Sequence, residues 1–106
     1  MDMNSIMQQA QQFQQNMARV QEELALLKVT GSAGGGMVTV TVNGKSEMLA
    51  IVIERAIIVE SEAEMLQDLI VAASNDALRK AGEIAKAEMG KLTGGFNLPG
   101  LSSMLG

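Results

Sequence analysis

Residues 3–27 read MNSIMQQAQQFQQNMARVQEELALL, and apolar side chains recur in them at steps that alternate between three and four residues. This spacing is the a/d heptad pattern, which places one narrow apolar stripe along a helix. A long helix with a single apolar stripe is not stable alone in water, so the stripe must pack on another surface. The pattern therefore predicts a long first helix and a dimer. The stripe consists of Met3, Ile6, Ala10, Phe13, Met17, Val20, Leu24 and Leu27.

The flanks of this stripe are polar but uncharged, since no charged side chain lies between Asp2 and Arg19. Glutamine is a good helix former, and solubility is the simplest role for it. The alternative is a helix face that approaches a polyanion without repulsion and hydrogen-bonds to it. On that alternative, base contacts would come from Gln8, Gln12 and Gln15.

The middle of the chain predicts a three-stranded antiparallel meander. Residues 37–42 read MVTVTV, which is the period-two pattern of a strand with one buried face. The following Asn43-Gly44 predicts a two-residue hairpin turn that pairs Val38 with Leu49 on a return strand over about 46–54. The glycines at 34–36 predict the turn from a first strand at about 27–33.

Residues 55–60 fit either a short strand or a buried connector. A second long helix is predicted from Ser61, because Ser61 and Glu64 have the S-x-x-E spacing of a capping box. Its apolar stripe is rich in alanine, which allows close packing. The helix should end near Gly90. Within it, Asn75 and Asp76 fit either a hydrogen bond across an interface or exposure to water. We expect one domain over 1–90 and a flexible Gly- and Met-containing tail over 91–106, which could instead dock on a partner.

Composition excludes most catalytic chemistry. The chain has no cysteine and no histidine, which removes the usual zinc ligands and nucleophile–base pairs. Gly44-Lys45-Ser46 lacks the first glycine of a phosphate-binding loop and precedes a strand rather than a helix. The acidic residues at 60–68 suit a solvated helix start. We therefore predict no enzyme activity, no cofactor and no metal, and a cytoplasmic protein without a membrane span.

Charge is segregated along the chain, although the net charge is only −4. The helical ends, residues 1–19 and 77–106, hold five cations and three anions, whereas residues 20–76 hold three cations and nine anions. The helix dipole accounts for cations late in the second helix. It does not account for a neutral first helix at the same end of the molecule. The helical ends are therefore a candidate surface for a polyanion.

Three stretches together resemble the YbaB/EbfC family of bacterial nucleoid-associated proteins. They are the Gln- and Met-rich first helix, VTGSAGGGMVTVTVNGK over 29–45, and MLQDLIVAASNDA over 65–77, and the resemblance covers essentially the whole chain. It implies a tweezer-like homodimer with a body of strands and projecting helical arms. It also implies binding to double-stranded DNA with limited sequence preference, and a link to recombination and repair. The cations at matching positions are Arg19, Arg79, Lys80 and Lys86.

These observations predict an α+β fold of the order α-β-β-β-α that acts as a homodimeric, nucleoid-associated DNA-binding protein. The predicted DNA contacts are the four arm cations, with Gln8, Gln12 and Gln15 on the first helix. The alternative is a protein–protein adaptor of the recombination or replication machinery that uses the sheet face or the tail.

Overall fold

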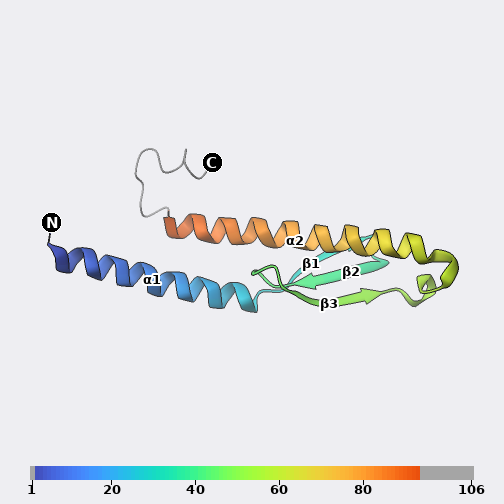
Figure 1. The fold of residues 1–106 in the computed structure, drawn as a ribbon, viewed down its shortest axis with the longest axis horizontal. Helices are drawn as coiled ribbons and strands as arrows, with labels where there is room; N and C mark the ends of the chain where they lie inside the picture. The colour runs from blue at the N-terminus through green and yellow to red at the C-terminus, as the bar shows by residue number, and fades with distance from the viewer. Residues whose placement is uncertain (1, 94–106) are drawn as a thin grey trace.

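The computed structural model describes residues 2–93 and is strongly elongated, with extents of 69 × 27 × 16 Å (Figure 1). Its radius of gyration is 19.6 Å, against roughly 13 Å for a compact chain of this length. The predicted α-β-β-β-α order is confirmed. The elements are α1 (Met3–Leu26), β1 (Val29–Ala33), β2 (Val38–Val42), β3 (Met48–Ile53), the 3-10 turns η1 (Arg55–Ile57) and η2 (Glu60–Glu62), and α2 (Ala63–Thr93).

Helix α1 begins at an aspartate cap, where the Asp2 side chain accepts from the backbone N–H of Asn4 at 3.3 Å. A carboxylate suits this position because the first backbone N–H groups of a helix have no internal partner. Only the last part of its heptad stripe is buried, at Val20 and Leu24. The rest of α1 projects away from the sheet (Figure 1). The stripe thus packs within the chain over only part of its length.

The three strands form an antiparallel sheet in the order β1-β2-β3, as the sequence predicts. Between β1 and β2, Val29 lies opposite Val42 and Ala33 lies opposite Val38. The connecting glycines Gly34, Gly35 and Gly36 have φ angles of 65°, 66° and 95°. Glycine adopts these angles without the steric cost that other residues pay, so the predicted turn is present.

The predicted register between β2 and β3 is wrong. Val38 lies opposite Ile53 rather than Leu49, and the pairing shifts between Thr41 and Val42, which lies opposite Met48. Leu49 therefore falls at the irregularity instead of opposite Val38. Ile51 and Ile53 do share the face of the β2 valines, as expected from the alternation.

The side chain of Asn43 explains this shift. Its Oδ1 accepts from the backbone N–H groups of Lys45 and Glu47 at 2.9 and 3.0 Å, which spreads the turn over more residues than a two-residue hairpin. The positive φ lies at Ser46 (64°) rather than at Asn43-Gly44. Gly44 is needed for another reason: its N–H donates to the carbonyl of Leu24 at 2.7 Å, and an added Cβ would lie 2.7 Å from that oxygen.

Helix α2 starts two residues later than predicted and continues through Gly90 to Thr93. Residues 55–62 form a connector with two 3-10 turns, and Ile57 is its buried residue. The predicted tail lies largely in residues 94–106, outside the described part of the chain. The core is formed where α2 crosses the sheet, by the fully buried Val38, Val40, Val42, Ala73, Ala77 and Ala81.

Helix and sheet approach closely because both surfaces are made of small residues. A Cβ added at Gly31 of β1 would overlap the backbone of Ala73 and Ala77. Only glycine fits this point of contact, since both neighbours are main-chain atoms of a packed helix. The alanine stripe predicted to allow close packing is therefore used against the chain's own sheet.

The two edges of the sheet differ. At β1, Asp76 Oδ2 accepts from the backbone N–H of Ser32 at 3.1 Å, and Lys80 Nζ lies 3.5 Å from the carbonyl oxygen of Thr30. Asp76 therefore bonds across the helix–sheet interface, whereas Asn75 is exposed. At the opposite edge, β3 is exposed from Met48 to Val52. Side chains of α2 occupy polar groups of β1 and leave β3 without cover.

Candidate nucleic-acid interface

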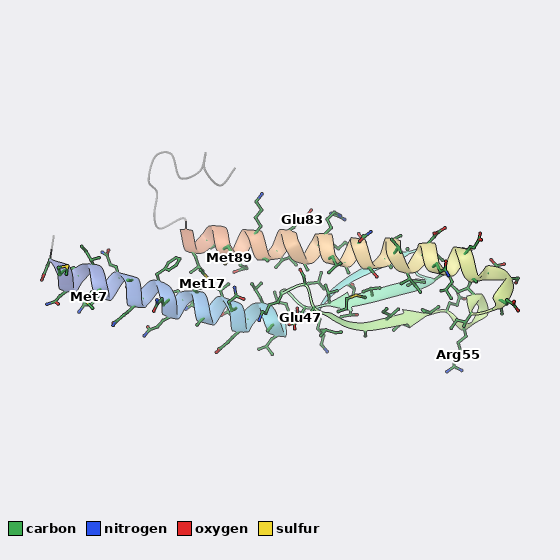
Figure 2. The ribbon with its side chains drawn as sticks, in the orientation of Figure 1. Met7, Met17, Glu47, Arg55, Glu83 and Met89 are labelled. Atoms are coloured by element: carbon green, nitrogen blue, oxygen red, sulfur yellow. The ribbon has the colours of Figure 1, made fainter. Side chains whose placement is uncertain are left out.

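The start of α1 and the end of α2 run antiparallel and together form one arm, defined here as residues 3–19 and 77–93 (Figure 1). Figure 2 shows Met17 of α1 beside Met89 of α2. Both side chains are half-buried. With a rise of about 1.5 Å per residue in each helix, Arg19 then lies near the level of Lys86. The structure thus brings the end of α2 beside α1, whereas Ala77 and Ala81, at the start of the same α2 segment, pack on the sheet.

The three predicted glutamine contacts lie on α1. Gln8, Gln12 and Gln15 are all exposed, and their spacing of four and three residues places them along one face. Their amides can donate and accept hydrogen bonds without bringing a negative charge to the surface. A phosphate backbone can therefore approach this face without repulsion.

Arg79 is exposed, but it is already paired. Its guanidinium lies 3.0 Å from Asp76 Oδ1 and 3.1 Å from Glu83 Oε1, one turn away on either side. The hydrogen bond to Asp76, followed by the charge of Glu83, raises the pKa of Arg79. A phosphate that binds Arg79 must compete with two carboxylates of the same helix.

Lys80 is also held within the chain. Its Nζ lies 3.1 Å from Asp76 Oδ2, and it reaches the β1 carbonyl of Thr30. The hydrogen bond from Lys80, then that from the Ser32 N–H, lowers the pKa of Asp76. Lys80 therefore helps to tie α2 to β1, a role that its position in the sequence did not indicate.

The remaining arm cations differ in whether they have an ion-pair partner. Arg19 lies 3.8 Å from Glu23 in an exposed pair, and Lys91 lies 3.0 Å from Glu88. Among residues 2–93, Lys86 has no ion-pair partner and its side chain is exposed. Exposed pairs contribute little free energy, so Arg19 remains available to a phosphate at small cost. Lys86 is available without any exchange of partners.

Two further exposed cations near α1 are not among the DNA contacts predicted from the sequence. Lys28 lies two residues after the end of α1, and Lys45 occupies the β2–β3 turn, whose Gly44 is hydrogen-bonded to the last turn of α1. Neither has an ion-pair partner within the described residues. Both belong to residues 20–76, the acidic part of the chain. Only the contact between the turn and α1 brings Lys45 to the base of the arm.

Residues 2–93 contain no cluster of three or more acidic side chains arranged to hold a metal ion. In the same residues, neither helix has an apolar stretch long enough to cross a bilayer.

The family model of the YbaB/EbfC DNA-binding family matches residues 1–96, which include the whole arm and the sheet. The chain belongs to the YbaB/EbfC DNA-binding family. The resemblance drawn from the helix, the glycine-rich turn and residues 65–77 is thereby confirmed.

Curated relatives of this YbaB/EbfC family member match almost end to end. A nucleoid-associated protein of Desulfotalea psychrophila is 58% identical over 105 residues, covering 99% of both chains. A nucleoid-associated protein of Clostridium novyi is 52% identical over 101 residues, covering 95% of this chain and 89% of the relative. The similarity therefore extends over the full arm-and-sheet architecture.

An uncharacterized protein from Helicobacter pylori has a similar solved structure, with a TM-score of 0.75 and 24% sequence identity. The match covers 82% of this chain and 91% of the other. At this identity the likeness concerns the fold, and it agrees with the α-β-β-β-α arrangement of the YbaB/EbfC family member described here.

Proposed function

We propose that this protein is a nucleoid-associated protein that binds double-stranded DNA, with limited sequence preference, through the helical arms of a homodimer. The observation that carries the proposal is that one arm combines a charge-free stretch of α1 with Lys86 of α2, a cation that has no ion-pair partner within residues 2–93. Family membership and the names of the relatives support DNA as the ligand and the bacterial nucleoid, within the cytoplasm, as the location.

Phosphate contacts supply the affinity on this proposal. Lys86 and Arg19 lie at a similar level of the arm, and Arg79 can exchange its carboxylate partners for phosphate. Lysine and arginine bind the DNA backbone by releasing condensed counterions, which makes affinity depend strongly on salt. With so few free cations per arm, we expect modest affinity. Lys80 contributes less, because its ammonium group helps to hold α2 on β1.

Limited sequence preference follows from the same surface. Contacts to phosphate position a protein on the duplex and carry no sequence information. Gln8, Gln12 and Gln15 are among the arm side chains suited to base edges, and these three lie on a single face. We assign them to supporting hydrogen bonds, mainly to the backbone and sugars.

The homodimer is supported by the uncovered strand. Ile51 lies opposite Val40 and therefore shares the face on which α2 packs, yet it is 45% exposed, whereas Val40 is fully buried. The difference arises because α2 covers β1 and β2 but not β3. Exposed contiguous apolar surface of this kind marks interaction sites. A second copy placed by two-fold symmetry would cover the two β3 faces at once and pair the two arms.

The test is a fluorescence anisotropy titration of a mixed-sequence duplex at several salt concentrations. Lys86→Gln should weaken binding roughly three- to tenfold near 0.1 M salt and reduce the salt slope by about 0.9 per lost phosphate contact. Arg55→Gln is the matched control: Arg55 is likewise exposed and unpaired among the described residues, and it lies far from the arm (Figure 2). Equal effects of the two substitutions would contradict binding by the arm.

A protein–protein adaptor for recombination or replication machinery is the second candidate. It is favoured by apolar side chains away from the arm, such as Val52 on the outer sheet face (66% exposed) and Ile58 (55%). No DNA binding at low salt, together with a copurifying protein that is lost on Val52→Ser or Ile58→Ser, would favour this function over the first.

A further inference from the structure

The first half of α1 carries an apolar stripe that nothing in the described chain covers. Met3 and Met7 are 74% and 58% exposed, whereas Val20 and Leu24, further along the same helix, are 5% and 3% exposed. We call Met3, Ile6, Met7 and Ala10 the distal stripe. Methionine and isoleucine side chains at this spacing cost free energy when they face water, so a permanent cover would stabilise the arm.

The distal stripe lies on the part of α1 that extends beyond the end of α2. Figure 2 places Met89 beside Met17, and the two helices run in opposite directions. At about 1.5 Å per residue, the last residue of α2, Thr93, reaches the level of Phe13. Residues 3–12 of α1, a length of roughly 15 Å, therefore extend beyond α2 (Figure 1).

The chain that follows Thr93 has a suitable length and composition to cover this surface. Residues 94–106 can span up to about 43 Å when extended, nearly three times the exposed length of α1. They contain no charged side chain, and α1 contains none between Asp2 and Arg19. Contact between the two segments therefore removes no ion from water. The large apolar side chains available are Phe96, Leu98, Leu101, Met104 and Leu105.

We propose that residues 94–106 bind along the distal stripe of α1 of the same chain. Attachment at Thr93 holds them beside this stripe at an effective concentration in the millimolar range, so modest apolar contacts suffice. Bound there, they cover the stripe and prevent arms of different molecules from associating through it. The proposal concerns the arm alone and does not depend on DNA binding or on dimerisation.

Disulfide trapping tests this contact directly, because the natural chain has no cysteine. The double variant Met7→Cys, Ser102→Cys should form a disulfide within one chain rapidly under mild oxidation. The matched control is Ser5→Cys, Ser102→Cys, since Ser5 lies close in height on the opposite face of α1. Non-reducing electrophoresis separates the intrachain product from linked pairs of chains. Equal rates in the two variants, or a product that links two chains, would overturn the proposal.

Hydrogen exchange provides a second readout in the full-length protein. The double variant Leu101→Ser, Leu105→Ser should speed amide exchange in residues 5–12 severalfold, while exchange in β2 stays unchanged. Asn97→Ser, which removes no apolar side chain, should leave residues 5–12 as in the natural protein. Unaltered exchange of α1 in the leucine variant would show that these residues do not cover the stripe.

Discussion

At the scale of single residues, Asp76 does the most to join parts of the fold that are distant in sequence. Its two carboxylate oxygens bind Lys80, Arg79 and the backbone N–H of Ser32, which lies 44 residues away. The carboxylate thereby satisfies a strand-edge donor and partly neutralises two cations that the sequence pointed to as DNA contacts. One acidic residue thus affects both stability and the charge offered by the arm.

These contacts predict how stability changes with pH. Because the pKa of Asp76 is lowered from its ordinary 3.8, its stabilising contribution is complete above that value and is lost as the pH falls through the lower pKa of the folded state. Asp76→Asn should therefore lower the melting temperature at pH 6 and have a much smaller effect near pH 2. Thermal unfolding followed by circular dichroism measures both. Asp68→Asn, on the exposed side of α2, should change stability little at either pH.

Gly31 is the most restrictive position in the core. Gly31→Ala should destabilise the protein by about 2–3 kcal/mol or prevent folding, because the added methyl group meets the backbone of Ala73 and Ala77. Urea unfolding measures the change. Gly90→Ala, where an added Cβ has no neighbour within 4 Å, should instead stabilise α2 by up to about 1 kcal/mol. A Gly31→Ala protein as stable as the natural one would mean that helix and sheet are less closely packed than described.

At the scale of elements, the offset of α2 determines which surfaces remain for other molecules. The helix lies over β1 and β2, where the alanines of one meet the glycine and valines of the other. Side chains of α2 also occupy polar groups at the β1 edge. Strand β3 has apolar side chains on both faces, and its outer edge pairs with no other strand of residues 2–93. Free edges are places where other chains pair or pack.

This offset predicts which face of β3 a second copy covers. Ile51→Glu should convert the dimer to a monomer, because it places a carboxylate on the inner face of each β3; we expect dimer affinity to fall by at least about a hundredfold. Val52→Glu, the same chemical change one residue along on the outer face, should leave the dimer intact. Light scattering across a concentration series gives the mass of each variant.

Two results would contradict this assignment. A natural protein that remains monomeric at micromolar concentration would exclude the homodimer. Loss of the dimer in Val52→Glu but not in Ile51→Glu would place the interface on the outer face of the sheet.

At the scale of the whole molecule, the elongated shape separates two tasks. The sheet end holds most of the acidic residues and the surface that we assign to dimerisation, while the arm holds the uncharged helix and the available cations. This separation lets a protein with a net charge of −4 bring one end to a polyanion. Pairing two arms then increases affinity without adding new contacts to either arm.

Dimerisation and DNA binding should therefore be coupled. Ile51→Glu leaves every arm residue in place, yet it should weaken DNA binding at least about tenfold and roughly halve the salt slope, since one arm then binds instead of two. The anisotropy titration of a long duplex measures both quantities. Unchanged affinity and slope in a variant shown to be monomeric would mean that a single arm accounts for binding.

The sequence by itself determined the elements and their order, because these depend on local regularities. The heptad spacing of 3–27, the alternating valines of 37–42 and the glycines of 34–36 each specify a backbone conformation over a few residues. Asn43-Gly44 correctly predicted a hairpin but not its register. That register depends on where the Asn43 side chain bonds and on the approach of Gly44 to Leu24, which lies on another element.

Only the tertiary structure decided which charges and apolar surfaces are available. In the sequence, Arg79, Lys80 and Lys86 are equivalent cations on one helix. In the fold, Arg79 is held by Asp76 and Glu83, Lys80 is held by Asp76 and the β1 carbonyl of Thr30, and Lys86 is free among the described residues. The exposure of β3 likewise follows from the offset of α2. The ion pairs within α2 follow from helical periodicity, at spacings of three and four residues. The contacts of Asp76 and Lys80 with β1 and the exposure of β3 depend instead on distances between elements, about which that periodicity carries no information.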